Sequence, residues 1–155
     1  MNLDLGDLFM FGRVAGFDLG TPLDTVIPTL QRQGNVREWK GFADTVLFKA
    51  GGLELHFFDD ALYSVILIVA DAHAEGDILV FGEKRVTPRT TLRGIVGLLE
   101  EHGIGWRADP AHCVGKQVEL ITQGSAGLQF TMAGRVLCLD RVRLSEDRRF
   151  EELAP

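Results

Sequence analysis

Hydrophobic residues recur along this chain first at helical and then at strand spacing, and the same order occurs twice. One set falls at positions i, i+3, i+4 and i+7, and a second set repeats it sixty-nine residues later: Leu23, Val26, Ile27 and Leu30, then Leu92, Ile95, Val96 and Leu99. This spacing places each set on one side of a helix. Thr21 and Pro22 suit the start of the first helix, and Gly34 suits its end. The pattern predicts one helix at the beginning of each copy.

After each helix the period changes to two, and β-branched and aromatic residues become frequent. The predicted strands cover residues 44–50, 53–58 and 62–70 in the first copy, and residues 117–122, 127–132 and 136–144 in the second. Separators of two or three residues, such as 50–52 and 59–61, suit hairpin turns. Residues 71–77 are predicted to form a polar loop. Residues 78–81 are predicted to form a short strand that bridges the halves.

The two copies also match residue by residue. A Thr, a Leu, two branched aliphatic residues, a second Leu and a closing Gly coincide between residues 21–34 and 90–103, and a Trp follows each copy. Because such self-similarity indicates a duplicated unit, we predict a single domain, residues 1–155, made of repeat 1 (about 13–77) and repeat 2 (about 84–146). Pro28 and Gly97 occupy equivalent positions inside the helices, which predicts a kink or a helix-turn-helix there.

One such unit has too few strands to bury a sheet face well. The predicted fold class is therefore α+β: two tandem helix–β-meander repeats that form one antiparallel sheet of six or seven strands, with the helices on one face. Trp39 and Trp106, which follow the helices, are predicted to fill the gap between helix and sheet. An interface role for these two residues is the alternative.

Composition and cysteine content indicate the compartment. Hydrophobic residues make up 46% of the chain and charged residues 25%, which is typical of a globular domain. The apolar opening segment lacks basic residues and contains Asp4 and Asp7, so we expect no signal peptide, and no apolar run is long enough to span a bilayer. Cys113 and Cys138 are too few for a disulfide scaffold and are expected to be reduced. We therefore expect a cytoplasmic protein with no membrane association.

The net charge of −6 is concentrated in the first half of the chain. Residues 1–77 hold twelve acidic and five basic residues, whereas residues 78–155 hold ten acidic and eleven basic residues. Phosphate backbones are bound by clustered Lys and Arg, so the acidic half argues against a nucleic-acid partner. An acidic face suits a basic protein partner. A surface that is merely solvated would show the same charge balance.

The candidate partner-binding residues gather at one predicted hairpin. They are His56, Phe58, Asp59, Asp60 and Tyr63. Aromatic side chains beside a charged turn are typical of the anchor and rim of a protein interface. One alternative places the aromatic residues in the core and leaves Asp59 and Asp60 as ordinary turn residues. Another assigns His56 and the two aspartates to a hydrolase or lyase.

Two other patterns contain metal-ligand or nucleophile residue types. Asp71, His73, Glu75 and Asp77 stand at every second position and would align on one side of an extended segment. No paired ligand cluster accompanies them, so the sequence favours a solvated acidic loop and leaves metal binding open. His112 and Cys113 are adjacent, and adjacent residues rarely face each other as a base and a nucleophile must. No phosphate-binding, dinucleotide-binding or nucleophile-elbow motif occurs, so we predict no catalytic residue, no cofactor and no metal.

The first helix opens on Leu19-Gly20-Thr21-Pro22-Leu23-Asp24-Thr25-Val26, followed by Leu30. This opening resembles the motif that begins the repeats of the β-lactamase inhibitory protein family and of the small lipoproteins of the outer-membrane assembly machinery. Similar domains occur among cytoplasmic immunity proteins of bacterial toxin systems. The resemblance covers residues 13–145 and implies a binding protein built from helix-plus-meander repeats. Since this chain shows neither a signal peptide nor a lipoprotein cysteine, the cytoplasmic immunity proteins are the relatives that it implies.

The expected function is therefore a non-catalytic protein-binding protein. It is expected to be a bacterial immunity protein that neutralises a cognate toxin by covering the toxin's active site. The alternative is a small-molecule or peptide-binding regulatory sheet protein of the cytoplasm.

Overall fold

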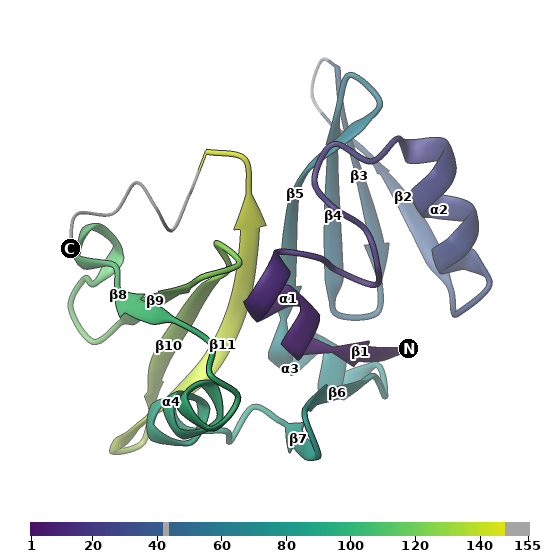
Figure 1. The fold of residues 1–155 in the computed structure, drawn as a ribbon. Coiled ribbons are helices and arrows are strands. Elements are labelled where there is room, and N and C mark those ends of the chain that lie inside the picture. Colours follow the sequence, from purple (N-terminus) through teal and green to yellow (C-terminus); the bar gives the residue numbers. More distant parts are fainter. Residues whose placement is uncertain (42–43, 148–155) are drawn as a thin grey trace.

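Most of the chain belongs to one large antiparallel sheet and the helices that pack on it (Figure 1). The computed structural model describes residues 1–41 and 44–147. The helices are α1 (Leu5–Phe11), α2 (Leu23–Gln31), α3 (Val69–Ala74), α4 (Leu92–Glu101) and the short 3-10 helix η1 (Pro110–His112). The strands are β1 (Asn2–Asp4), β2 (Val36–Lys40), β3 (Thr45–Ala50), β4 (Leu53–Phe58), β5 (Ala61–Ile68), β6 (Ile78–Phe81), β7 (Lys84–Val86), β8 (Trp106–Ala108), β9 (Val118–Thr122), β10 (Gly127–Ala133) and β11 (Val136–Ser145).

The eight-stranded sheet has the order β2-β3-β4-β5-β11-β10-β9-β8, and its neighbouring strands are antiparallel. The prediction of a mixed α+β fold with a mainly antiparallel sheet is confirmed. The predicted strand count was too low because the two edge strands, β2 and β8, were not recognised. The predicted bridging role of residues 78–81 was wrong. β6 instead pairs with β1 in parallel and with β7, in a separate three-stranded sheet.

The hydrophobic core lies on one face of the large sheet. Register aligns Phe48, Leu55, Val65 and Leu144 in one row across β3, β4, β5 and β11. All four belong to a single buried cluster, which also includes the main buried side chains of α1, α2 and α4: Leu8, Phe9, Val26, Leu30, Ile95 and Leu99. These helices therefore cover the core face. The alternation predicted for residues 53–58 is confirmed, since Leu53, Leu55 and Phe57 are fully buried.

The two predicted helices occur as α2 and α4, but their ends and shapes differ from the prediction, and α1 was not predicted. α2 continues through Pro28 and α4 continues through Gly97, so neither forms a helix-turn-helix. The N-cap of α2 is Pro22, and the Thr21 hydroxyl donates instead to the backbone oxygen of Asp18. Thr91, which is equivalent to Pro22 rather than to Thr21, does cap α4, because its hydroxyl accepts a hydrogen bond from the backbone N–H of Gly94 at 3.1 Å.

Residues 69–74 form a helix, so the predicted strand over residues 62–70 and the predicted loop over residues 71–77 were both partly wrong. β5 ends at Ile68, and α3 follows with Val69 and Ala72 completely buried. A helix has 3.6 residues per turn, so residues at every second position point to different sides. The burial of Val69 and Ala72 therefore outweighs the alternation of polar residues that suggested an extended loop.

The strands of the large sheet fall into two consecutive sets. α2 is followed by β2, β3, β4 and β5, whereas α4 is followed by β8, β9, β10 and β11. The two sets join where β5 pairs with β11, from Arg141 opposite Ile68 to Ser145 opposite Ser64. Figure 1 shows this junction near the middle of the molecule, with α2 beside the first set and α4 beside the second.

Candidate functional site

The face of the sheet opposite the core, called the polar face here, carries two adjacent rows of side chains. The first row contains Arg37, Lys49, Glu54, Ile66 and Arg143, and the second contains Trp39, Leu47, His56, Ser64 and Ser145. Each row crosses β2, β3, β4, β5 and β11 in register. Side chains two residues apart on a strand share a face, so this arrangement brings residues from both ends of the sequence together.

Three of the predicted partner-binding residues meet on the polar face. A bulge opposite His56 and Phe57 places Tyr63 near both His56 and Phe58. The Tyr63 ring packs edge to face against the rings of His56 and Phe58. The distances between ring centres are 6.1 Å and 6.3 Å, respectively. Phe58 is 54% exposed. The sequence therefore located an aromatic group correctly, while its role as a binding surface stays a prediction.

Asp59 and Asp60 form the two-residue turn between β4 and β5. Both have positive φ angles, 50° and 59°, as the hairpin turn with two left-handed central residues requires. Asp60 also accepts a hydrogen bond from the backbone N–H of Leu23 through its own backbone oxygen, at 2.8 Å. Both side chains are exposed. The turn interpretation is thus confirmed, and the two carboxylates stand at the same end of the hairpin as Phe58.

A hollow of about 400 Å³, called the central hollow here, lies on the polar face where β4, β5 and β11 run side by side. Its lining includes His56, Tyr63, Ser64, Ile66, Arg143 and Ser145, together with Glu146 and Asp147 just after β11. The sequence did not predict it, because Arg143 and Ser145 are far from His56 along the chain. The pairing of β5 with β11 brings them together.

The protonation of His56 is set by its place in the central hollow. Burial lowers the pKa of the His56 imidazole from its usual 6.5, because the charged form loses hydration. Glu54 on the same strand acts in the opposite direction, and Arg143 on β11 acts with burial. The nearest carboxylate oxygen of Glu54 is 3.9 Å from His56 Nε2, too far for a hydrogen bond. The neutral imidazole is therefore the favoured form.

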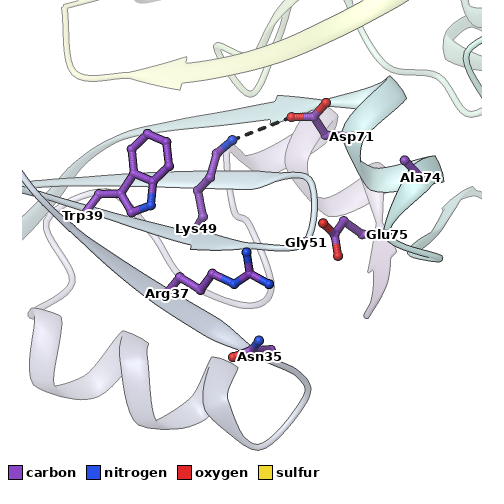
Figure 2. A pocket seen from close by; sticks show the side chains of 8 residues that line it. All are labelled: Asn35, Arg37, Trp39, Lys49, Gly51, Asp71, Ala74 and Glu75. Atoms are coloured by element: carbon purple, nitrogen blue, oxygen red, sulfur yellow. Dashed lines mark ion pairs between the residues drawn. The ribbon is translucent and has the colours of Figure 1, made fainter.

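A second pocket, called the edge pocket here, lies where the sheet edge meets α3 (Figure 2). Its volume is about 320 Å³, and its lining includes Asn35, Arg37, Trp39, Lys49, Asp71 and Glu75. Lys49 Nζ lies 3.2 Å from Glu54 Oε1 and 3.7 Å from Asp71 Oδ2, and 5.5 Å from the centre of the Trp39 ring. This network connects the edge pocket to the central hollow through Glu54.

The two tryptophans have different environments. Trp39 lies on the edge strand β2 and is 56% exposed, so the prediction that it fills a gap between helix and sheet was wrong. Register places Trp39 in the same row as Leu47 and His56, on the face of the sheet away from the helices, so its side chain is open to solvent. Trp106 on β8 is partly buried and packs against the hydrophobic core, as predicted.

The alternating residues of segment 71–77, for which the sequence favoured a solvated loop and left metal binding open, are not brought together. Asp71 pairs with Lys49, and His73 and Glu75 are exposed. Asp77 is buried, where its carboxylate oxygens accept hydrogen bonds from the Met1 amino group at 2.9 Å and the Gly52 backbone N–H at 2.8 Å. Since these side chains take different directions, the segment offers no shared metal position among the described residues.

The sequence missed a different group with metal-ligand chemistry. Asp109, His112 and Glu119 place one ligand atom each within 4.8 Å of one another. The 3-10 turn η1 brings Asp109 and His112 together, and His112 Nδ1 is hydrogen-bonded to Asp109 Oδ2 at 2.9 Å. A cation would have to replace that bond. The three-residue spacing of Asp109 and His112 was the available signal, since such residues are neighbours on a helical turn.

The thiol beside His112 is not arranged as a nucleophile with that histidine as its base. Cys113 Sγ donates to the backbone oxygen of Asp109 at 3.2 Å and accepts from the backbone N–H of Glu119 at 3.4 Å. Cys113 is exposed, Cys138 is buried in β11, and neither forms a disulfide. The expectation of two unpaired thiols is confirmed in the structure.

Comparisons with known proteins add no relative to this description. No protein-family model, no curated protein and no solved structure matches this chain. Within residues 1–41 and 44–147, none of the helices has the length and apolar character needed to cross a bilayer.

Proposed function

We propose that this chain is a non-catalytic protein-binding protein that uses the polar face of its sheet near the β4–β5 hairpin. The observation that carries the proposal is the exposed aromatic group beside an acidic turn. Phe58 contacts the Tyr63 ring edge to face yet remains more than half exposed, and Asp59 and Asp60 follow it directly. An aromatic anchor with a charged rim is the arrangement that protein interfaces use for affinity and orientation.

The more specific form of the proposal is a bacterial immunity protein of the cytoplasm that neutralises a cognate toxin. An inhibitor of this kind needs a rigid surface rather than reacting groups. The polar face extends over five hydrogen-bonded strands, and the opposite face of the same strands packs on the buried core. Two unpaired cysteines agree with a reducing compartment. The acidic first half of the chain would direct association with a basic toxin surface.

We also infer that the domain arose by duplication of repeat 1 (about 13–77) and repeat 2 (about 84–146). In each repeat a helix precedes four strands, and the last strands of the two repeats pair at the centre of the sheet. A matching hydrogen bond supports the inference. The backbone oxygen of Thr21 accepts from the N–H of Leu62, and that of Thr90 accepts from the N–H of Leu139.

The proposal is tested by capturing the partner and measuring protection. The tagged chain is used to purify binding proteins from the source cells, and each captured protein is expressed in a host alone and together with the chain. If the chain is an immunity protein, one captured protein should stop growth of the host when expressed alone. The same protein should not stop growth when it is expressed together with the chain. Captured proteins that never affect growth would contradict the immunity assignment.

Variants of the hairpin then test the proposed surface. Phe58→Ala should accelerate dissociation of the partner and cost about 1–3 kcal/mol of binding if Phe58 is an anchor. Asp59→Asn with Asp60→Asn should slow association and weaken its salt dependence, because it removes exposed charge. Asn tolerates the left-handed φ of both positions, so the turn is kept.

Phe11 provides the matched control for Phe58, since it is the same residue type, is 57% exposed and lies on α1. Phe11→Ala should leave association and dissociation rates unchanged. Equal effects of Phe11→Ala and Phe58→Ala would place the interface elsewhere on the molecule.

A further inference from the structure

The central hollow contains buried polar atoms without hydrogen-bond partners. Ser145 is 8% exposed, and its hydroxyl oxygen has no partner in the structure. His56 Nε2 is also buried and without a partner. Leaving such groups unsatisfied destabilises a fold, and these two line the same hollow. Their convergence indicates a site that a ligand completes.

A cation lines the same hollow. Arg143 on β11 is close enough to His56 to oppose protonation of the imidazole. It is half-buried, and within the described part of the chain it forms no ion pair, whereas Lys49 in the neighbouring pocket is held by Glu54 and Asp71. A guanidinium that is partly withdrawn from water and unpaired is a favourable place for an anion.

We propose that the central hollow binds a small carboxylic acid, with Arg143 as the counterion of the carboxylate. The planar guanidinium matches two carboxylate oxygens with two parallel N–H groups. The Ser145 hydroxyl and the neutral His56 imidazole, in the tautomer that carries its hydrogen on Nε2, supply further donors, and Ile66 provides an apolar wall for the rest of the molecule. A volume of about 400 Å³ lies within the range of ordinary small-molecule sites.

The charges around the hollow favour a carboxylate over a phosphate. Among the described residues of the lining, Arg143 is the one basic residue, and Glu146 and Asp147 belong to the same lining. Glu54 lies nearby, with a carboxylate oxygen 3.9 Å from His56 Nε2. Arg143 balances one negative charge, and a second negative charge on the ligand would add repulsion from these carboxylates.

Benzoate is the probe, and benzamide is its uncharged analogue. Benzoate should shift the NMR signals of the His56 and Tyr63 rings in a saturable manner, and benzamide should shift them at least tenfold more weakly. Arg143→Gln should weaken benzoate binding at least tenfold, and Ser145→Ala should weaken it severalfold. Arg85→Gln is the control, because Arg85 is an exposed arginine on β7, and it should bind benzoate like the wild type.

Equal binding of benzoate and benzamide, or unchanged binding in Arg143→Gln with an intact thermal transition, would overturn the proposal. N-acetyl-glutamate amide mimics a glutamate side chain of a protein, so it tests whether the bound carboxylate comes from a protein. Tighter binding of this probe than of benzoate would overturn the assignment to a small molecule. The proposed protein partner is tested separately, by the variants of Phe58 and of the Asp59-Asp60 turn, which are not part of the hollow's lining.

Discussion

At the scale of single residues, His56 links protonation to the stability of the fold. The groups that face it are Glu54 on its own strand, Tyr63 on β5 and Arg143 on β11. Its folded-state pKa lies below the unfolded value of 6.5, so between the two values the unfolded chain binds more protons. The free energy of unfolding therefore rises with pH in this window. The His56 contribution is complete above pH 6.5 and is lost as pH falls through the folded-state pKa.

Urea unfolding at a series of pH values between about 7.5 and 5 measures this effect. His56→Gln should reduce the loss of stability over that range relative to the wild type. His73→Gln, at an exposed position on α3, should keep the wild-type pH dependence. A His56→Gln curve parallel to the wild-type curve would show that the imidazole does not supply the linkage.

At the scale of elements, two glycines test how the helices are held. Gly97 lies at an exposed position inside α4, and a Cβ atom there would have nothing within 4 Å. Gly124 follows β9 where the end of α1 meets the sheet, and its N–H donates to the backbone oxygen of Phe9 at 2.9 Å. A Cβ atom on Gly124 would lie within 2.8 Å of backbone atoms of Leu8, Phe9 and Gly12.

Gly97→Ala should stabilise the protein by about 0.5–1 kcal/mol, because alanine loses less backbone entropy in a helix. Gly124→Ala should destabilise it by at least about 1 kcal/mol, because α1 must move away from the β9–β10 turn. Thermal and urea unfolding of both variants measure whether each substitution raises or lowers the free energy of unfolding. Since each substitution adds one methyl group, an equal effect would mean that α1 is not held against this turn.

The elements that the sequence predicted are those with a strong local pattern. α2 and α4 were predicted from hydrophobic spacing, and the strands from 53–58, 117–122, 127–132 and 136–144 were predicted to within about two residues of their ends. β2 was missed because its sequence shows no period of two: the charged residues Arg37 and Glu38 are adjacent, and both are exposed. β8 was missed because three residues are too few to show a period.

Only the part of the candidate site that lies on strands adjacent in the sequence was predicted. His56, Phe58 and Tyr63 were grouped correctly because one hairpin joins them. Arg143 and Ser145 could not be grouped with them, because their proximity depends on the pairing of β5 with β11, which joins distant parts of the chain. Trp39 was assigned to the wrong environment for a similar reason, since only the pairing of β2 with β3 shows that Trp39 is on the polar face.

At the scale of the whole molecule, β11 connects the two sets of strands. It pairs with β5 on one side and with β10 on the other, so the large sheet cannot separate without breaking its ladders. Cys138 lies in this strand at 7% exposure, and the segment before α4 covers it through a bridge with Thr91. Two fully buried residues of α4, Ile95 and Leu99, hold that helix on the core.

Thiol reactivity therefore reports the opening of the whole fold. In the native protein Cys113 should react rapidly with a thiol reagent because it is exposed. Cys138 should react only when α4 leaves β11, and its rate should follow the fraction of unfolded molecules as urea is added. A Cys113→Ser variant isolates the slow reaction. If Cys138 in that variant reacted as fast without urea as it does in the unfolded chain, α4 would open independently, and the two sets of strands would not form one cooperative unit.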